Sequence, residues 1–167
     1  MARLLVPMSM LSLLSMGAIF GFFYAWVCST MWGLDATDPR VAITAMQAMN
    51  ASVRNPVFFP AFFLTPVILA LTAIIAARES RTKAAFLFTT SAAIYFAGAL
   101  LVTAMVNVPM NEALAQVTVP IDSAAAAEIW KAYSTPWQFW NTLRTLVSGF
   151  ALLLTGLAIF ALTPETD

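Results

Sequence analysis

The side chains best suited to chemistry lie on one predicted helix near the end of the chain. Four polar or aromatic residues share a single helix face through i, i+4, i+7, i+11 spacing: Trp137, Asn141, Arg144 and Ser148. Arg144 lies about two turns inside this helix, where a guanidinium is costly unless it faces a partner or a ligand. The pattern therefore predicts either a buried ion pair, with Asp35 or Glu112 as the partner, or a polar site that donates hydrogen bonds to a ligand.

Other polar side chains lie at the ends of apolar segments. In a chain that crosses a membrane four times, odd segments end at the face where even segments begin, so these ends converge on one end of the bundle. The predicted polar pocket consists of Tyr24, Asn50, Arg54, Asn107, Asn111, Trp137, Asn141 and Arg144. No catalytic residue follows from the pattern, and the candidate bases are Asp35 and Glu112. A structural role stays open, since asparagines at helix ends often cap or join helices.

The composition of the chain predicts that these apolar segments lie in a membrane. Hydrophobic residues make up 61% of the 167 residues and charged residues only 10%, against about 45–50% and about 25% in soluble domains. The chain has no histidine and one cysteine, which excludes histidine-based triads, imidazole ligands and thiolate clusters, so we expect no metal and no cofactor. A net charge of zero gives no electrostatic attraction for nucleic acid.

Uncharged runs of about 20 residues or more predict transmembrane helices. We expect an all-α integral membrane four-helix bundle, a single domain over residues 1–167, with spans at about 9–32, 56–77, 84–107 and 137–162. A short amphipathic helix is predicted after span 1, over 39–53, and a second before span 4, over 123–133. Helix starts are predicted at three capping residues that precede proline: Asp38, Asn55 and Thr135. Val108-Pro109 is predicted to end span 3, and Gly17 with Gly21 to pack closely on another helix.

The orientation is weakly encoded. Basic residues crowd the short connection between spans 2 and 3, at Arg78, Arg81 and Lys83, and Arg3 precedes span 1. The excess of positive charge in short loops favours the cytoplasmic side. We therefore expect both termini in the cytoplasm.

The ordered motifs resemble those of a known family. They include Gly21-Phe22-Phe23-Tyr24, Asn107-Val108-Pro109-Met110-Asn111 and Trp140-Asn141-x-x-Arg144. The set resembles the family of small four-helix membrane proteins that includes the fungal anthrone oxygenases, and the resemblance covers nearly the whole chain. Its many bacterial members are mostly of unknown function, so we expect the bacterial inner membrane as the location. The resemblance implies that dioxygen converts a polycyclic phenolic ketone to a quinone without a metal.

Three functions fit these observations. The first is a cofactor-independent oxygenase for a lipophilic anthrone-type substrate. The second is an accessory subunit that packs against a membrane-protein partner or another copy of itself, and the third is a binder of a lipophilic aromatic small molecule within the lipid bilayer. An enzyme predicts a cavity lined by Asn107, Asn141 and Arg144, whereas an accessory subunit predicts that these groups satisfy one another with no void.

Overall fold

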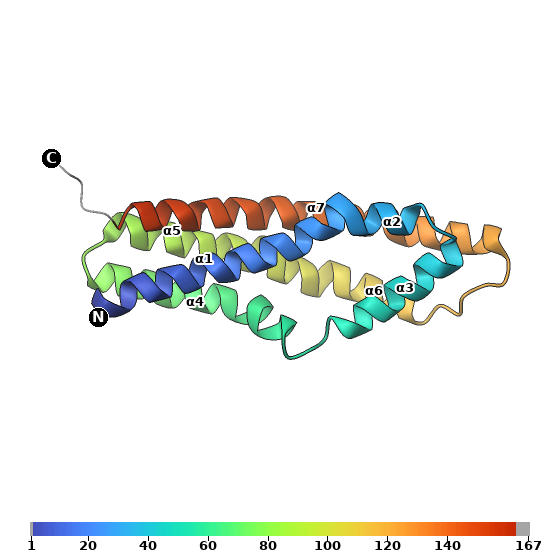
Figure 1. Cartoon of the computed structure of the whole chain (residues 1–167), viewed down its shortest axis with the longest axis horizontal. Helices are drawn as coiled ribbons and strands as arrows, with labels where there is room; N and C mark the ends of the chain where they lie inside the picture. Colours follow the sequence, from blue (N-terminus) through green and yellow to red (C-terminus); the bar gives the residue numbers. More distant parts are fainter. Residues whose placement is uncertain (1, 163–167) are drawn as a thin grey trace.

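The computed structural model describes residues 2–162, and these form four long helices side by side (Figure 1). The first consists of α1 (Ala2–Ala25), a π-helical turn η1 (Trp26–Thr30) and α2 (Met31–Asp35). The second is α4 (Phe58–Arg78). The third consists of α5 (Thr82–Tyr95), the π-helical η2 (Phe96–Leu101) and η3 (Thr103–Asn107), and α6 (Val108–Ala115). The fourth is α7 (Ser123–Phe160). The predicted all-α four-helix bundle is confirmed.

The helix lengths fit a membrane protein in which three of the four long helices exceed the length that a hydrocarbon core requires. All four long helices are apolar enough to cross a membrane. The 21 residues of α4 extend about 31 Å, which matches a hydrocarbon core of about 30 Å. The other three contain 33, 34 and 38 residues. Their extra turns lie at the end where α3 (Pro39–Ser52) packs, opposite the α4–α5 turn (Figure 1).

The amphipathic helix after span 1 is present as α3. Asp38 caps it, with its side chain accepting from the backbone N–H of Arg40, and Pro39 is the first helical residue. Ala42 and Met46 are fully buried on its inner face. Together with residues of α2, α6 and α7, this face forms a hydrophobic core at the α3 end of the bundle.

Three predicted helix boundaries are wrong. The segment before span 4 is not a separate helix, because α7 continues through Pro136, and its early turns are held by burial of Trp130 and Tyr133 against α3 and α6. Val108-Pro109 does not stop the third helix, because Pro109 occupies the first turn of α6, where no helical donor is needed. Asn55 does cap the start of α4 through Oδ1, but the helix begins at Phe58.

Close helix packing uses other glycines than the predicted pair. A Cβ atom built on Gly17 or Gly21 meets nothing within 4 Å, so these two residues contact no other helix closely. A Cβ atom on Gly98 would lie 2.5 Å from Cγ1 of Val147. The close approach is therefore between η2 and α7, beside the region described next.

Candidate functional site

A cavity of about 350 Å³ lies inside the bundle beside the first turns of α4. Its volume is within the range of small-molecule sites. One part of its wall is aromatic and includes Phe22, Phe23, Trp26, Phe58, Phe62 and Trp137. The other part is polar and includes Asn50, Thr103, Asn107, Asn111, Asn141 and Arg144. The cavity can therefore hold a flat apolar molecule that carries oxygen atoms at one edge.

Arg144 supplies a buried positive charge to the polar part. The residue is only 4% exposed. Its Nη1 donates to Oγ1 of Thr103 at 2.9 Å and its Nη2 to Oδ1 of Asn141 at 3.0 Å, while Nε has no partner. The guanidinium lies 4.6 Å from the ring centroid of Phe23, a favourable cation–π distance. Among the described residues no carboxylate pairs with Arg144, so its charge remains available to a ligand.

Asn107 offers an amide without partners next to this charge. The residue is 1% exposed, and neither its Nδ2 nor its Oδ1 makes a hydrogen bond within residues 2–162. A buried amide left unpaired costs about 1–3 kcal/mol for each unsatisfied group. Native proteins rarely tolerate such a cost without a reason, and a ligand in the cavity would supply the missing donor and acceptor.

Asn111 is held in one orientation by two donors. Oη of Tyr133 and Nε1 of Trp137 both donate to its Oδ1, at 2.8 and 2.9 Å. An indole N–H can only donate, so the oxygen of the amide must face Trp137. The NH₂ group of Asn111 is then left as a donor on the opposite side. Asn50 extends this network, since its Nδ2 donates to Oη of Tyr133 at 3.3 Å.

Asn141 connects the charge to the helix that carries the aromatic wall. Its Nδ2 donates to the backbone oxygen of Phe23 at 3.1 Å, while its Oδ1 accepts from Arg144. Phe23 lies just before η1, and η3 contains both Thr103 and Asn107. π-Helical turns shift the register of a helix and often occur at functional sites. Here η1 and η3 lie in the two long helices that bring Phe23, Thr103 and Asn107 to the cavity.

The two candidate bases occupy different places. Glu112 lies in the cavity lining and forms an ion pair with Arg54, with 3.1 Å between Oε1 and Nη2. Both side chains are about half exposed, at 59% and 51%, so this pair forms a mouth of the cavity. Asp35 is exposed outside the cavity and accepts from Nε1 of Trp130 and Nε2 of Gln138. Neither acid forms the ion pair with Arg144 that the sequence left open.

Tyr24 is the one predicted pocket residue outside the cavity lining. It is half exposed and lies in a groove between α1 and α7 on the other side of α1. The other predicted pocket residues all line the cavity: Asn50, Arg54, Asn107, Asn111, Trp137, Asn141 and Arg144. Sequence reasoning missed the phenylalanines and Thr103. The i, i+4 spacing of Phe58 and Phe62, one turn after the cap at Asn55, was an available signal.

The described residues contain no group of three or more histidine, cysteine, aspartate or glutamate side chains that could hold a metal ion. The polar groups that line the cavity are amides, guanidinium groups, a hydroxyl and the carboxylate of Glu112. Together with the aromatic rings, they can bind a ligand by hydrogen bonds, charge and ring contacts.

Comparison with known proteins places this geometry in a family. The sequence profile of the anthrone oxygenase family matches residues 49–154. The matched region includes every polar residue of the cavity, from Asn50 to Arg144. No curated protein matches the chain, and no solved structure matches it. Because the match covers more than half of the 167 residues, the chain belongs to the anthrone oxygenase family.

Proposed function

We propose that the protein oxygenates a lipophilic polycyclic phenolic ketone of the anthrone type, with dioxygen as the oxidant. The observation that carries the proposal is the unpaired polar pair at the inner end of the cavity. Nε of Arg144 and both amide atoms of Asn107 are buried without partners, against an aromatic wall. Family membership supplies the reaction class.

The proposed binding mode follows the two parts of the cavity. The aromatic rings of the substrate lie among the phenylalanines, and its carbonyl oxygen accepts from Arg144 and Asn107. Loss of a proton from the methylene carbon converts the ketone to an enolate, whose negative charge develops on this oxygen. Donors that are already in place when charge develops lower the barrier without further reorganisation. In a protein interior their effect is larger than in water.

The oxygenation step can be written with all atoms balanced. The enolate gives one electron to dioxygen, and the resulting radical and superoxide combine to form a carbon–oxygen bond. After protonation this gives a hydroperoxide, which loses water to leave the quinone. In total, an anthrone and one dioxygen yield an anthraquinone and one water. The aromatic system of the substrate supplies the electrons, so the protein contributes binding, charge and a path for the proton.

Glu112 is the base that the geometry favours. The carbonyl and the reactive methylene of an anthrone lie on opposite edges of its central ring. A carbonyl bound at Arg144 therefore turns the methylene away from the inner end. Glu112, at the mouth, is the carboxylate within the cavity lining, and a general base must come within hydrogen-bond reach of its proton.

The test is oxygen uptake and quinone formation with anthrone in lipid nanodiscs. The purified protein should oxidise anthrone faster than protein-free nanodiscs do. Arg144→Met should lower this rate by about 10²–10³-fold, as expected for loss of one oxyanion donor. Lys131→Met is the matched control, because Lys131 is an exposed cation on the same helix and should leave the rate unchanged. Equal rates with and without protein would contradict the proposal.

Binding without turnover is the second candidate, and the same cavity supports it. In that case an anthraquinone would stabilise the protein against heat, with no anthrone oxidation above background. An accessory role is supported less well, because it predicts a void-free site in which Asn107 is satisfied, and Asn107 is not.

A further inference from the structure

A second hollow lies on the other side of the cavity wall. It is a groove of about 560 Å³ between α1 and α4. It shares five lining residues with the cavity: Phe22, Trp26, Met49, Val53 and Phe58. These shared side chains touch the groove on one side and the cavity on the other, so they form a wall one residue thick.

The groove lies at the depth where a lipophilic phenol collects in a bilayer. Because α4 matches the hydrocarbon thickness, its first residue marks the boundary between hydrocarbon and headgroups. The groove extends from Val57, which is 83% exposed just before α4, to Ala18 further along α1. A molecule with apolar rings and a polar edge prefers this boundary, as tyrosine and tryptophan do.

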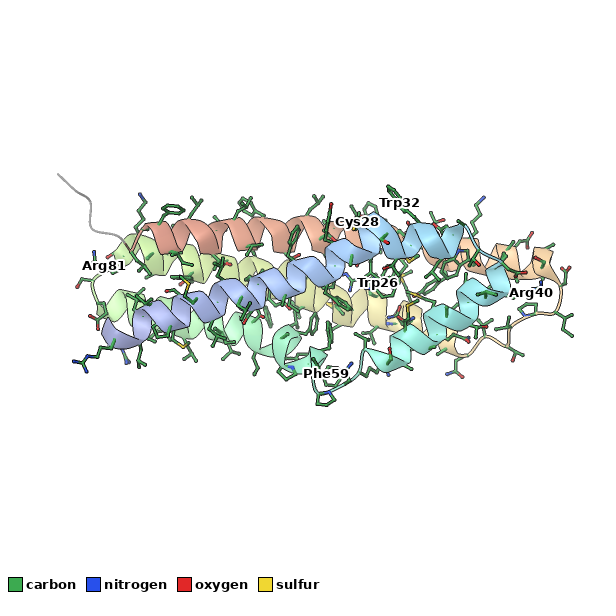
Figure 2. The ribbon with its side chains drawn as sticks, viewed as in Figure 1. Trp26, Cys28, Trp32, Arg40, Phe59 and Arg81 are labelled. Carbon is green, nitrogen blue, oxygen red and sulfur yellow. The ribbon has the colours of Figure 1, made fainter. Side chains whose placement is uncertain are left out.

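Side chains form the shared wall, and three of the five are aromatic: Phe22, Trp26 and Phe58. The ring centroids of Phe22 and Phe58 are 4.7 Å apart, and those of Trp26 and Trp137 are 5.1 Å apart. Trp26, at the start of η1, lines the cavity, whereas the exposed Trp32 points away from the bundle (Figure 2). Rotation of a partly buried ring therefore suffices to connect the groove with the cavity. Ala18 and Ala61 keep the groove open because their side chains are small.

The other mouth of the cavity is less suited to an apolar molecule. The ion pair between Arg54 and Glu112 crosses it. On its lipid side, Phe59 and Phe63 pack edge to face with centroids 5.5 Å apart. A molecule that entered there would have to pass a charged pair, whereas the groove between α1 and α4 is lined mainly by apolar side chains.

We propose that the lipophilic aromatic substrate enters sideways from the bilayer, through the groove between α1 and α4 and past Phe22, Trp26 and Phe58. The identity of the molecule rests on the proposed function, but the route does not depend on turnover. It makes the membrane the reservoir from which the site is filled. The mouth at Arg54 and Glu112 then serves exchange with water.

Benzophenone, a flat-ringed apolar ketone that bonds to nearby C–H groups under ultraviolet light, tests the route directly. The full-length protein is reconstituted in liposomes containing benzophenone, illuminated, digested and mapped by mass spectrometry. In the unaltered protein, adducts are expected at residues that line the cavity but not the groove, such as Thr103, Val108 and Trp137. The absence of adducts at these residues would overturn the proposal.

Ala61→Trp should block the groove without altering the lining of the cavity, and adducts in the cavity should fall by about ten-fold, as for an entry step that limits filling. Ala70→Trp is the matched control, because Ala70 is an exposed alanine on the same helix outside both hollows, and its adducts should equal those of the unaltered protein. Ala18→Trp blocks the groove from α1 and provides the same test should Ala61→Trp fail to fold.

Equal labelling of the cavity in the blocked and control variants would overturn the proposed route. The protein could also lose cavity labelling when the groove is blocked and yet never oxidise anthrone. That result would support the route and contradict only the oxygenase function. The two proposals therefore fail by different observations.

Discussion

The two ends of the bundle treat buried polar groups in opposite ways. The α4–α5 turn lies at one end of the bundle (Figure 1). In the half of the bundle nearer to it, buried hydroxyls pair with each other and with backbone oxygens. The hydroxyl oxygens of Ser12 and Thr72 lie 2.9 Å apart, as do those of Ser91 and Thr155. At the other end, Asn107 and Nε of Arg144 have no partner within the described residues and face a cavity. Helix packing alone does not require open polar atoms, and their presence at one end is the reason why we propose the ligand site there.

The difference also appears in the helices themselves. The paired hydroxyls lie on regular α-helical turns of α1, α4, α5 and α7. Of the unpaired groups, Asn107 lies in the π-helical segment η3, and Arg144 on α7 donates to Thr103 at the start of the same segment. A regular helix satisfies its own backbone and packs tightly, whereas a π-helical turn displaces side chains from their usual positions. At the end with the cavity, packing is therefore looser and some buried polar groups lack hydrogen-bond partners, which leaves space and unpaired donors.

After Arg144→Met, the largest expected effect is at Asn107. Asn107→Leu keeps the approximate shape of the side chain and removes the open amide. We expect anthrone oxidation in nanodiscs to fall by about 10²-fold. Thermal unfolding followed by circular dichroism should show no loss of stability, because an apolar group replaces an unsatisfied polar one. A folded variant with normal turnover would contradict a ligand role for this amide.

A smaller effect tests the packing between the two ends. Gly98→Ala would place Cβ 2.5 Å from Cγ1 of Val147, and relief of this overlap should cost about 1–3 kcal/mol of unfolding free energy. Gly17→Ala is the control in the same kind of measurement, because no atom lies within 4 Å of its added Cβ. That control should be neutral or stabilising, since alanine favours helix by about 1 kcal/mol. Equal effects at both positions would show that the contact with Val147 does not limit packing.

At the end near the α4–α5 turn, we expect a smaller change in unfolding free energy and no effect on turnover. A double-mutant cycle of Ser91→Ala and Thr155→Ala should give a coupling of about 0.6 kcal/mol, typical of hydrogen bonds between membrane helices. Anthrone turnover should stay unchanged in all three variants. A loss of turnover equal to that of Asn107→Leu would remove the distinction between the two ends.

The smallest effect concerns the cap of α3 at the site end. The hydrogen bond and charge of Arg40 lower the pKa of Asp38 from 3.8 to about 2. Because the folded-state pKa is below the unfolded one, this stabilisation is complete above about pH 4 and is lost as the pH falls towards about 2. Asp38→Asn keeps a capping side chain but cannot titrate. Its unfolding temperature should therefore fall less than that of the unaltered protein between pH 5 and pH 2, and parallel curves would contradict the assignment.

Much of this architecture follows from the sequence. Uncharged runs predict the spans, and the i, i+4, i+7 spacing from Trp137 to Arg144 predicts the polar face of α7. Odd and even spans meeting at one end predict that Asn107 lies near this face. These inferences succeed because they rest on helix periodicity and on the cost of charge in lipid, which hold regardless of packing.

The remaining details depend on packing. Four consecutive residues, Gly21 to Tyr24, cover the whole circumference of a helix, so the motif cannot show that Phe22 and Phe23 face inward and Tyr24 outward. In the sequence, Pro109 and Pro136 indicate helix ends. In the structure the helices continue through both prolines, because a register change and tertiary contacts stabilise the helical backbone there. The missing partners of Asn107 likewise depend on distances between helices that no spacing rule provides.

The most direct test of the central claim is the thermal stability of Arg144→Met in detergent or nanodiscs. If the buried charge serves a ligand, its replacement by an apolar side chain should leave the unfolding free energy unchanged or raise it by about 1 kcal/mol, since the unneutralised charge is costly to bury. If instead Arg144 holds the bundle together through an ion pair, the same change should lower the unfolding temperature sharply, and adding Glu112→Gln should restore it. The account predicts the first result, and the second would contradict it.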